Sequence, residues 1–209
     1  MSGVFEVQHP LIDCHLTRLR DARTPSDEFR HLIRRLSTLL AYEATNDLRC
    51  EQTEVSTPLT TTEGSRLGER VGIVPILRAG LGMVDPVLDL IPTAEVWHLG
   101  LYRDEATAQP VEYYSKLPPG HPVDTALILD PMLATGGSVL AALETLKRWG
   151  VGRVKMLSVL AAQKGIDRVS EAFPDLQVYV CRIDPVLNDH NYIVPGLGDA
   201  GDRIFNTPG

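Results

Sequence analysis

Residues 125–149, TALILDPMLATGGSVLAALETLKRW, carry the strongest structural pattern in the chain. The first five residues form a short, continuous apolar run, which is typical of a strand buried on both faces of a parallel sheet. From Val139 onward, apolar residues recur at the spacing of one face of a helix, at 139, 142, 143 and 146. The stretch therefore predicts a buried strand that ends before Asp130, a turn, and an amphipathic helix over 137–149.

The turn contains residues suited to binding a phosphate. Residues 135–138, Thr-Gly-Gly-Ser, precede the expected helix, whose first N–H groups lack partners inside the helix and point outward. The two glycines let the backbone approach an anion closely, and the hydroxyls of Thr135 and Ser138 add donors. An ordinary strand-to-helix turn with Ser138 as N-cap would show part of this pattern. The glycine spacing of a dinucleotide fold and a Gly-Lys-Ser/Thr sequence are both missing, so the turn predicts a phosphate or phosphosugar site of another kind.

Asp130 begins the same turn but has the opposite chemistry. A carboxylate repels phosphate, whereas it accepts hydrogen bonds from sugar hydroxyls and binds divalent cations. Both roles are open on the residues alone.

Short apolar runs alternate with helical patterns from Val71 onward, which is the signature of βαβ units and a parallel sheet. The expected strands are 71–76, 95–101, 125–129, 154–160 and 177–183, and the expected helices between them are 81–90, 137–149 and 165–173. Ligands in such sheets bind beyond the carboxyl ends of the strands. Arg78, Arg103 and Asp130 each follow a strand end, so we expect them at one edge.

The N-terminal third has fewer signals. Thr24, Pro25 and Asp27 form a capping-box pattern and predict the start of an amphipathic helix of about 20 residues. Arg34 and Arg35 fit the solvated face of that helix better than a phosphate site. Residues 1–23 predict no more than an edge strand or arm, and the polar stretch 50–70 predicts edge strands and a loop.

Arg78 is a candidate for pyrophosphate binding. It lies between a strand end and Gly80-Leu81-Gly82, and its planar guanidinium can donate to two phosphate oxygens at once. The connection 102–119, which begins beside Arg103 and contains Tyr113, Tyr114 and Lys116, is too long for an ordinary loop. Two interpretations stay open for it, a lid over the site and a dimerisation arm.

The segment 191–202 interleaves glycines with apolar Ile193, Val194 and Leu197. A frayed, solvated tail would not need apolar residues at this spacing, so we expect a packed segment that presents backbone groups to a ligand. His190, beside Asp189, is the one histidine near this segment, and we assign it no acid–base role.

Residues 130–138, DPMLATGGS, resemble the phosphoribosyl pyrophosphate motif of type I phosphoribosyltransferases, in the form with Pro131 that is found in the uracil phosphoribosyltransferase family. Residues 192–205, YIVPGLGDAGDRIF, resemble the uracil-binding segment of the same family, and residues 74–83, VPILRAGLGM, resemble its pyrophosphate loop. His9-Pro10-Leu11 and residues 40–45 resemble its N-terminal region, so the likeness covers essentially the whole chain. The departures are Gln163-Lys164 in place of Pro-Glu and Asn206 in place of glycine.

The resemblance implies an α/β protein with an approximately five-stranded parallel sheet flanked by helices, a β-arm and a C-terminal base-binding hood. It implies one domain over 1–209, with an N-terminal arm and long helix over about 1–70, a parallel core over about 71–183 and a base-binding tail over about 184–209. The implied enzyme transfers the phosphoribosyl group of phosphoribosyl pyrophosphate to uracil, giving UMP and diphosphate in pyrimidine salvage.

The resemblance also implies the site. Catalysis falls to Arg78, Arg103, Asp130 and Asp199. Phosphoribosyl pyrophosphate is bound by Arg78, Arg103, Asp130, Pro131, Met132, Leu133, Ala134, Thr135, Gly136, Gly137, Ser138 and Asp199, and uracil by Ile193, Gly198, Asp199 and Ala200. Mg²⁺ is held mainly through the substrate, without an assigned protein ligand. A homodimer or higher homo-oligomer and a GTP effector are further expectations of the resemblance.

Composition limits the alternatives. The chain has 209 residues, 44% of them hydrophobic, 20 Lys and Arg against 27 Asp and Glu, and a net charge of −7. This balance argues against a nucleic-acid partner. The three cysteines are far apart and predict no disulfide framework or zinc site. No apolar run is long enough for a membrane span and no signal pattern precedes the core, so we expect no membrane partner and a cytoplasmic protein.

Two other functions fit the same pattern. One is a weakly catalytic regulator that senses nucleotide and binds RNA, which would need a basic surface. The other is a purine or orotate transferase, which differs only in the base pocket.

Overall fold

The computed structural model describes residues 3–103, 110–115 and 117–208, and the side chains of residues 101–116 lie outside that description. A parallel sheet forms its centre, with the strand order β1-β11-β10-β8-β4-β5 and a short strand β9 that also pairs with β10. The strands are β1 (Gly3–Glu6), β4 (Val71–Pro75), β5 (Glu95–Val96), β8 (Thr125–Leu129), β9 (Met132–Leu133), β10 (Arg153–Ala162) and β11 (Gln177–Asp184). The α/β class and the parallel sheet are therefore confirmed, with more strands than the sequence predicted.

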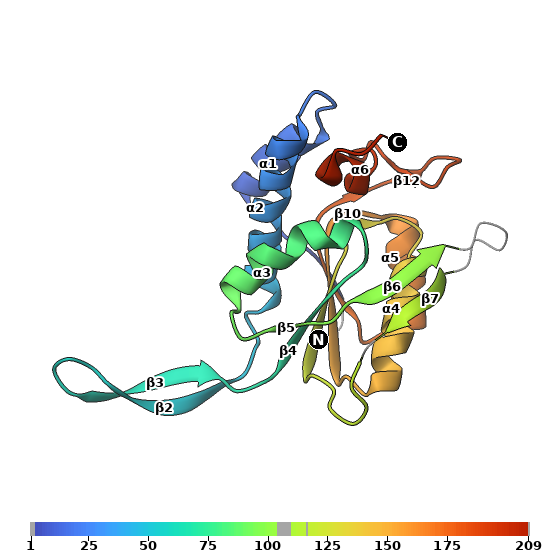
Figure 1. Cartoon of the computed structure of the whole chain (residues 1–209). Helices are drawn as coiled ribbons and strands as arrows, with labels where there is room; N and C mark the ends of the chain where they lie inside the picture. Colours follow the sequence, from blue (N-terminus) through green and yellow to red (C-terminus); the bar gives the residue numbers. More distant parts are fainter. Residues whose placement is uncertain (1–2, 104–109, 116, 209) are drawn as a thin grey trace.

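Helices cover both faces of the sheet (Figure 1). They are α1 (Pro10–Arg20), α2 (Ser26–Ala44), the 3₁₀ helix η1 (Ala79–Met83), α3 (Val84–Leu90), α4 (Gly137–Trp149), α5 (Gln163–Ala172) and α6 (Ala200–Phe205). The first four pack with α6 on one face, and α4 and α5 lie on the other. Strand β8 is buried throughout because Leu127 and Leu129 face the first group while Ala126 and Ile128 face the second.

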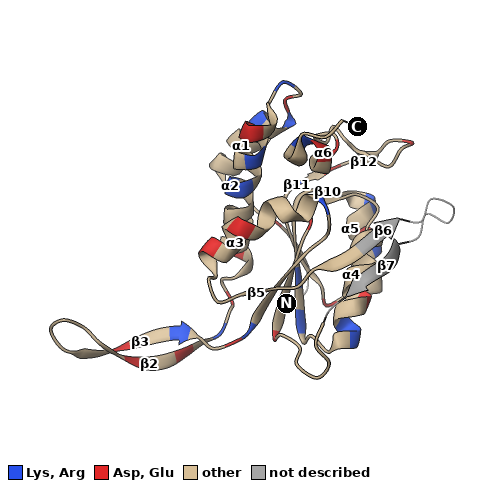
Figure 2. Cartoon of the chain, in the orientation of Figure 1, with Lys and Arg blue, Asp and Glu red and all other residues tan. Residues whose placement is uncertain are grey.

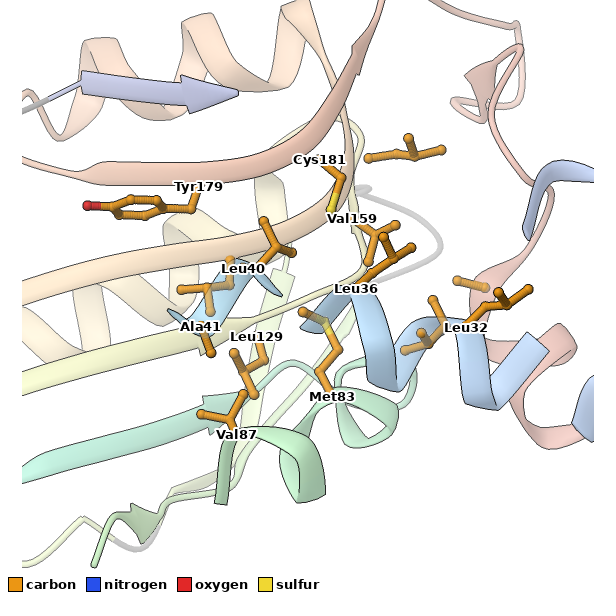
Figure 3. Packing of buried hydrophobic residues seen from close by; sticks show 14 of the residues in the cluster. Leu32, Leu36, Leu40, Ala41, Met83, Val87, Leu129, Val159, Tyr179 and Cys181 are labelled. Carbon is orange, nitrogen blue, oxygen red and sulfur yellow. The ribbon is translucent and has the colours of Figure 1, made fainter. Parts of the chain in front are cut away.

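The core on the α2 side is continuous across the sheet. Figure 3 shows Leu36 and Leu40 of α2 directed at Leu129, Val159 and other residues of the sheet. The predicted long helix is confirmed, because α2 has 19 residues and buries its apolar face. The capping box is wrong: Pro25 is the N-cap residue, and the Thr24 hydroxyl instead donates to the carbonyl of Arg18.

Two N-terminal elements bear on the prediction for residues 1–23. Strand β1 is an edge strand beside β11, one of the two forms expected for this region. Helix α1 was not predicted. Its signals are Pro10 in the first turn and the buried stripe Ile12, Leu16 and Leu19, which its polar residues make hard to recognise.

The predicted strand 95–101 is interrupted. Glu95–Val96 pairs with β4, Leu99 makes one further parallel bridge to Ile76, and the chain continues as β6 (Leu99–Arg103), which pairs with β7 (Pro110–Ser115) in an antiparallel hairpin. The side chain of Trp97 packs edge-on against Trp149 of α4, with ring centroids 5.5 Å apart. An apolar run does not show where a chain stops pairing with one strand and begins to pair with another, so local sequence could not locate the break between β5 and β6.

Residues 50–70 form strands as expected, but not at the edge of the sheet. Strands β2 (Cys50–Ser56) and β3 (Thr61–Leu67) pair only with each other, as a hairpin that projects from the body (Figure 1). All of their residues are exposed or half-buried, so this hairpin contributes little to the core.

A buried polar cluster holds the amino end of the sheet. Lys155 of β10 has no exposed surface, and its ammonium group donates to the carbonyl of Ala44 (2.6 Å) and to the carboxylate of Asp47. Arg153 pairs with Glu69 at 2.9 Å. A buried charge needs such partners, and here they tie the end of α2 to β10.

Acidic and basic residues are interspersed along the helices and the β2–β3 hairpin (Figure 2). Several of them form ion pairs, such as Arg34 with Asp85 and Arg66 with Glu51. Among the described residues, no helix is both long and apolar enough to cross a membrane.

Candidate active site

The sheet is interrupted at the residue expected to carry the chemistry. Strand β8 ends at Leu129, and the chain re-enters the sheet as β9 two residues after Asp130. On either side of the break, the Asp130 N–H donates to Leu157 (3.2 Å) and the Pro131 carbonyl accepts from Leu160 (2.9 Å). The break places Asp130 beyond the carboxyl end of a central strand, where ligands of parallel sheets bind.

The carboxylate of Asp130 is held in a water-poor setting. One oxygen accepts the N–H of Met132 at 3.2 Å. Burial raises the pKa of Asp130 to about 7, and the Met132 hydrogen bond opposes that rise only in part. The protein alone therefore does not offset the desolvation cost of the ionised carboxylate, as expected of a group that accepts hydrogen bonds from a ligand.

The turn after β9 is open for an anion. Gly136, with a φ of 77°, is the N-cap residue of α4 and no side chain caps the helix, so the alternative in which Ser138 is the N-cap is wrong. A cavity of about 90 Å³ is lined by Asp130 and residues 132–139. The N–H groups at the start of α4 border this cavity and give it a positive electrostatic character.

Helix α5 supports the turn from behind, which the sequence did not predict. A Cβ atom on residue 165 would lie 2.3 Å from the carbonyl oxygen of Ala134, so only glycine lets the helix approach this closely. The guanidinium of Arg168 donates to the carbonyl of Thr135 at 3.1 Å. Gly165 was predicted only as part of a helix, and an exposed arginine such as Arg168 has no sequence signal that separates it from a surface residue.

Arg78 lies beside the same edge of the sheet. It follows β4 directly, and the peptide bond that joins it to Leu77 is cis. Its side chain is 59% exposed, and its Nη2 donates to Asp202 of α6 at 3.1 Å. The loop that carries Arg78 thus contacts the C-terminal segment.

The C-terminal segment is packed and ordered, as predicted. Asp184 accepts hydrogen bonds from Arg20 and from the N–H of Gly196. Arg203 donates to the carbonyls of Leu19, Asp21 and Leu197, so it ties the segment internally and to the end of α1. Asp202 accepts a hydrogen bond from Arg78.

This segment closes a second cavity, of about 200 Å³. Its lining residues are Ala79, Met132, Ala134, Asn191, Tyr192, Ile193, Gly198, Asp199, Ala200 and Gly201. The segment residues predicted to contact a base are all among them, whereas Asn191 and Tyr192 were not singled out. Asp199 also caps α6 by accepting the N–H of Asp202 at 2.9 Å.

The two cavities are neighbours. Met132 and Ala134 line both of them, the first around the turn before α4 and the second beneath the C-terminal segment. A ligand of two linked parts, one anionic and one a small polar ring, fits this arrangement. A larger cavity of about 470 Å³ lies at the amino ends of β10 and β11, is lined by residues such as Lys147, Arg153 and Phe173, and shares no lining residue with these two.

Some predicted residues cannot be placed. The backbone of Arg103 ends β6, but its side chain and those of Tyr113 and Tyr114 are outside the described residues, as is Lys116 altogether. The choice between a lid and a dimerisation arm for 102–119 therefore stays open. Asn206, one of the departures from the family pattern, has a φ of 55°, a backbone conformation that asparagine tolerates better than most residues.

Comparison with known proteins gives a consistent result. The family model described as Uracil phosphoribosyltransferase matches residues 6–207. A protein named uracil phosphoribosyltransferase from Roseiflexus sp. (strain RS-1) is 58% identical over 207 residues, covering 99% of this chain and 100% of that protein. The solved structure of the AQ2163 protein from Aquifex aeolicus has a TM-score of 0.91 at 38% identity and covers 97% of this chain and 98% of its own. A hypoxanthine phosphoribosyltransferase from Trypanosoma cruzi, at 13% identity, a TM-score of 0.50 and coverage of 76% and 75%, shares the fold alone.

Proposed function

The chain belongs to the uracil phosphoribosyltransferase family, and we propose that its two neighbouring cavities hold the two substrates of the reaction that this family name describes. The enzyme transfers the phosphoribosyl group of phosphoribosyl pyrophosphate to uracil, giving UMP and diphosphate. The observation that carries the proposal is that one cavity lies at an anion-binding helix start, the other lies under a glycine-rich segment, and the two share Met132 and Ala134.

The phosphoribosyl part of the substrate belongs in the cavity around residues 130–138. The N–H groups at the start of α4 and the hydroxyls of Thr135 and Ser138 are donors for its 5-phosphate. Asp130 stands at the mouth of that cavity, where its carboxylate can accept hydrogen bonds from the ribose hydroxyls. Such bonds add to the single hydrogen bond from Met132 that the half-buried carboxylate accepts within the protein, and they stabilise its ionised form.

The pyrophosphate leaving group belongs beside Arg78. Its guanidinium is largely exposed, lies next to Gly201 of the cavity under the C-terminal segment, and presents a fork suited to phosphate oxygens. On the family resemblance, we assign Arg103 to the pyrophosphate group as well.

Mg²⁺ fits the residues present, provided that the substrate supplies most of its ligands. Among the described residues, no cluster of three or more His, Cys, Asp or Glu side chains forms a metal cage. Mg²⁺ in phosphoryl and pyrophosphoryl sites is bound by one or two carboxylates and substrate oxygens, and the carboxylates of Asp130 and Asp199 at the two cavities match that donor set. When bound, the ion neutralises charge on the departing pyrophosphate.

Uracil belongs in the cavity under the C-terminal segment. Ile193, Gly198 and Ala200 have no polar side-chain atoms, so recognition of the base falls to their backbone groups, with Asp199 directed at the ribose. Gly198 lines this cavity and has a φ of 79°, which other residues rarely adopt. Uracil presents a donor between two acceptors, and backbone N–H and C=O groups can match that order.

The chemistry then requires positioning more than a reactive side chain. The two cavities hold the base nitrogen close to the ribose carbon that loses pyrophosphate, and this converts a bimolecular step into an intramolecular one. Arg78 and Arg103, which are assigned to the pyrophosphate, stabilise the charge that develops on the leaving group. No covalent intermediate with the protein is needed.

Several finer assignments rest on the family resemblance alone. They are a homo-oligomeric assembly, a GTP effector, a cytoplasmic location and the division of one domain into an N-terminal part (about 1–70), a core (about 71–183) and a tail (about 184–209).

The other two functions have less support. An RNA-binding regulator would need a basic surface, and charges of both signs are mixed over the described residues (Figure 2). A purine or orotate transferase would need a different base cavity, and the family model over residues 6–207 and the relative at 58% identity both bear the name uracil phosphoribosyltransferase.

The test is a direct assay. Purified protein is mixed with phosphoribosyl pyrophosphate, Mg²⁺ and one of uracil, cytosine, orotate or hypoxanthine, and nucleotide formation is followed by chromatography. We expect UMP from uracil and at least 100-fold less product from each other base. Equal use of another base, or no UMP in the presence of Mg²⁺, would refute the proposal.

A further inference from the structure

Asp202 is the charged residue of the C-terminal segment that the substrate assignments leave without a role. Its Oδ1 accepts hydrogen bonds from Nη2 of Arg78 at 3.1 Å and from the hydroxyl of Thr207 at 2.6 Å. Its side chain is 20% exposed, against 59% for Arg78. The acid is therefore the fixed member of the pair and the arginine the mobile one.

The backbone around Asp202 is anchored independently of Arg78. The N–H of Asp202 donates to Asp199 at 2.9 Å, and the next residue, Arg203, is tied to carbonyls of α1 and the segment after it. Ile204 is buried and lies close to Gly82 of η1, where a Cβ atom would meet its side chain at 3.1 Å. Helix α6 thus packs on the loop that follows Arg78, and the carboxylate has a defined position relative to that loop.

The pair leaves most of the guanidinium available. Of the three guanidinium nitrogens of Arg78, only Nη2 has a hydrogen-bond partner among the described residues. Nη1 and Nε can therefore donate to a bound anion without loss of the contact with Asp202. A guanidinium held at one corner also has fewer orientations to lose when that anion binds.

We propose that Asp202 is a positioning residue that orients the Arg78 guanidinium for the pyrophosphate group. Because α6 also carries Ala200 and Gly201 of the base cavity, one short helix then links the pyrophosphate end of the site to its base end. This inference rests on the function proposed above, in which Arg78 binds pyrophosphate.

The experiment measures pyrophosphate binding and turnover separately. Mg²⁺-pyrophosphate is titrated into the full chain by calorimetry, and kcat and KM are measured for both substrates. Asp202→Asn keeps the size of the side chain but removes its charge. We expect about a fivefold weaker pyrophosphate affinity, the upper end for a partly exposed ion pair, with a similar fall in kcat/KM for phosphoribosyl pyrophosphate and less than a twofold change in KM for uracil.

A double-mutant cycle distinguishes positioning from a general structural role. If Asp202 acts through Arg78, then Asp202→Asn in an Arg78→Met background should change pyrophosphate affinity by less than 1.5-fold, roughly the limit of such a comparison. The matched control is Thr207→Val, which removes the other hydrogen bond to the same oxygen and should leave pyrophosphate affinity at the parent value.

Four results would overturn the inference. They are parent-like affinity in Asp202→Asn, tighter binding in that variant, additive effects with Arg78→Met, and an equal loss in Thr207→Val. A drop in melting temperature of more than about 5 °C in Asp202→Asn would likewise show a structural role. If the parent chain itself forms no UMP, the proposed function fails instead, and that outcome is visible before any variant is compared.

Discussion

Replacing Asp130 with asparagine should make the protein inactive and more stable at once. The substitution keeps the shape of the side chain and an oxygen that can accept the Met132 N–H. It removes the negative charge that burial disfavours in the absence of substrate. Stability and activity should therefore change in opposite directions at one residue.

The magnitude follows from the pKa. A carboxyl whose pKa is about 7 in the folded protein and 3.8 in a model compound binds its proton more tightly when folded, by at most about 4 kcal/mol. Water still reaches part of the Asp130 side chain, which is half-buried, so we expect about 2 kcal/mol.

The sign of the pH dependence is fixed by the direction of this shift. Because the folded pKa is raised, the contribution of Asp130 to stability is fully present below about pH 4 and is lost as the pH rises through about 7. The Asp130→Asn variant has no carboxyl group to ionise, so it keeps this contribution to stability at every pH. The variant should match the parent near pH 4.5 and exceed it by about 2 kcal/mol near pH 8.

The measurements are urea unfolding and thermal unfolding at a series of pH values without substrate or metal, together with steady-state kinetics at pH 8. We expect a melting temperature higher by roughly 4 to 8 °C at pH 8 and a kcat/KM for phosphoribosyl pyrophosphate lower by about 100-fold or more. Asp189→Asn, which removes an exposed carboxylate outside both cavities, is the control and should follow the parent.

Two outcomes would refute the reasoning. If the stability difference between Asp130→Asn and the parent is the same at pH 4.5 and pH 8, Asp130 is not destabilised by ionisation. If the variant retains parent kinetics, the carboxylate does not contact the substrate.

Three further predictions test other parts of the molecule. Arg78→Lys, which keeps the charge but loses the planar fork, should raise the inhibition constant of pyrophosphate by about tenfold, and unchanged product inhibition would exclude a bidentate contact. Gly198→Val should abolish uracil use because the φ of 79° is unfavourable for valine. The parent should prefer uracil to cytosine by roughly 10⁴-fold in kcat/KM, and near-equal values for the two bases would show that the backbone of the segment does not select the base. Lys155→Met should lower the free energy of unfolding by about 3 kcal/mol, because the carboxylate of Asp47 and the Ala44 carbonyl lose their partner, and parent-like urea unfolding would contradict this expectation. The KM values should not change, since Lys155 and its partners lie at the other end of the sheet from the two cavities.

Local patterns predicted the elements whose environment is uniform along their length. Strand β8 and helix α4 were located correctly because burial on two faces, and then on one, produces distinct periodicities. The strand at 95–101 was not, because its two halves have different partners and the break between them depends on where Trp97 packs. Helix α1 was missed because three buried residues spread over eleven positions resemble a loop.

The site shows the same division. The turn at 130–138 and the segment at 191–202 could each be singled out, because their glycines and polar residues cluster in sequence. Their meeting at Met132 and Ala134 could not be derived from either motif alone. The contact between Arg78 and Asp202 spans 124 positions, and no local pattern carries information about a pairing at that range. Arg168 was missed for the same reason.

The approach of α5 to the phosphate-binding turn limits how far that turn can be treated as a portable motif. Nine residues, 130–138, contain all the residues that line the cavity except Val139. The carbonyl oxygen of Ala134 nevertheless lies only 2.3 Å from where a Cβ atom on residue 165 would be, and the carbonyl of Thr135 accepts a hydrogen bond from Arg168. A graft of the nine residues into another parallel α/β protein would leave both carbonyls without this support. We therefore expect a transplant to keep its shape only if Gly165 and the following turn of helix are transferred with it.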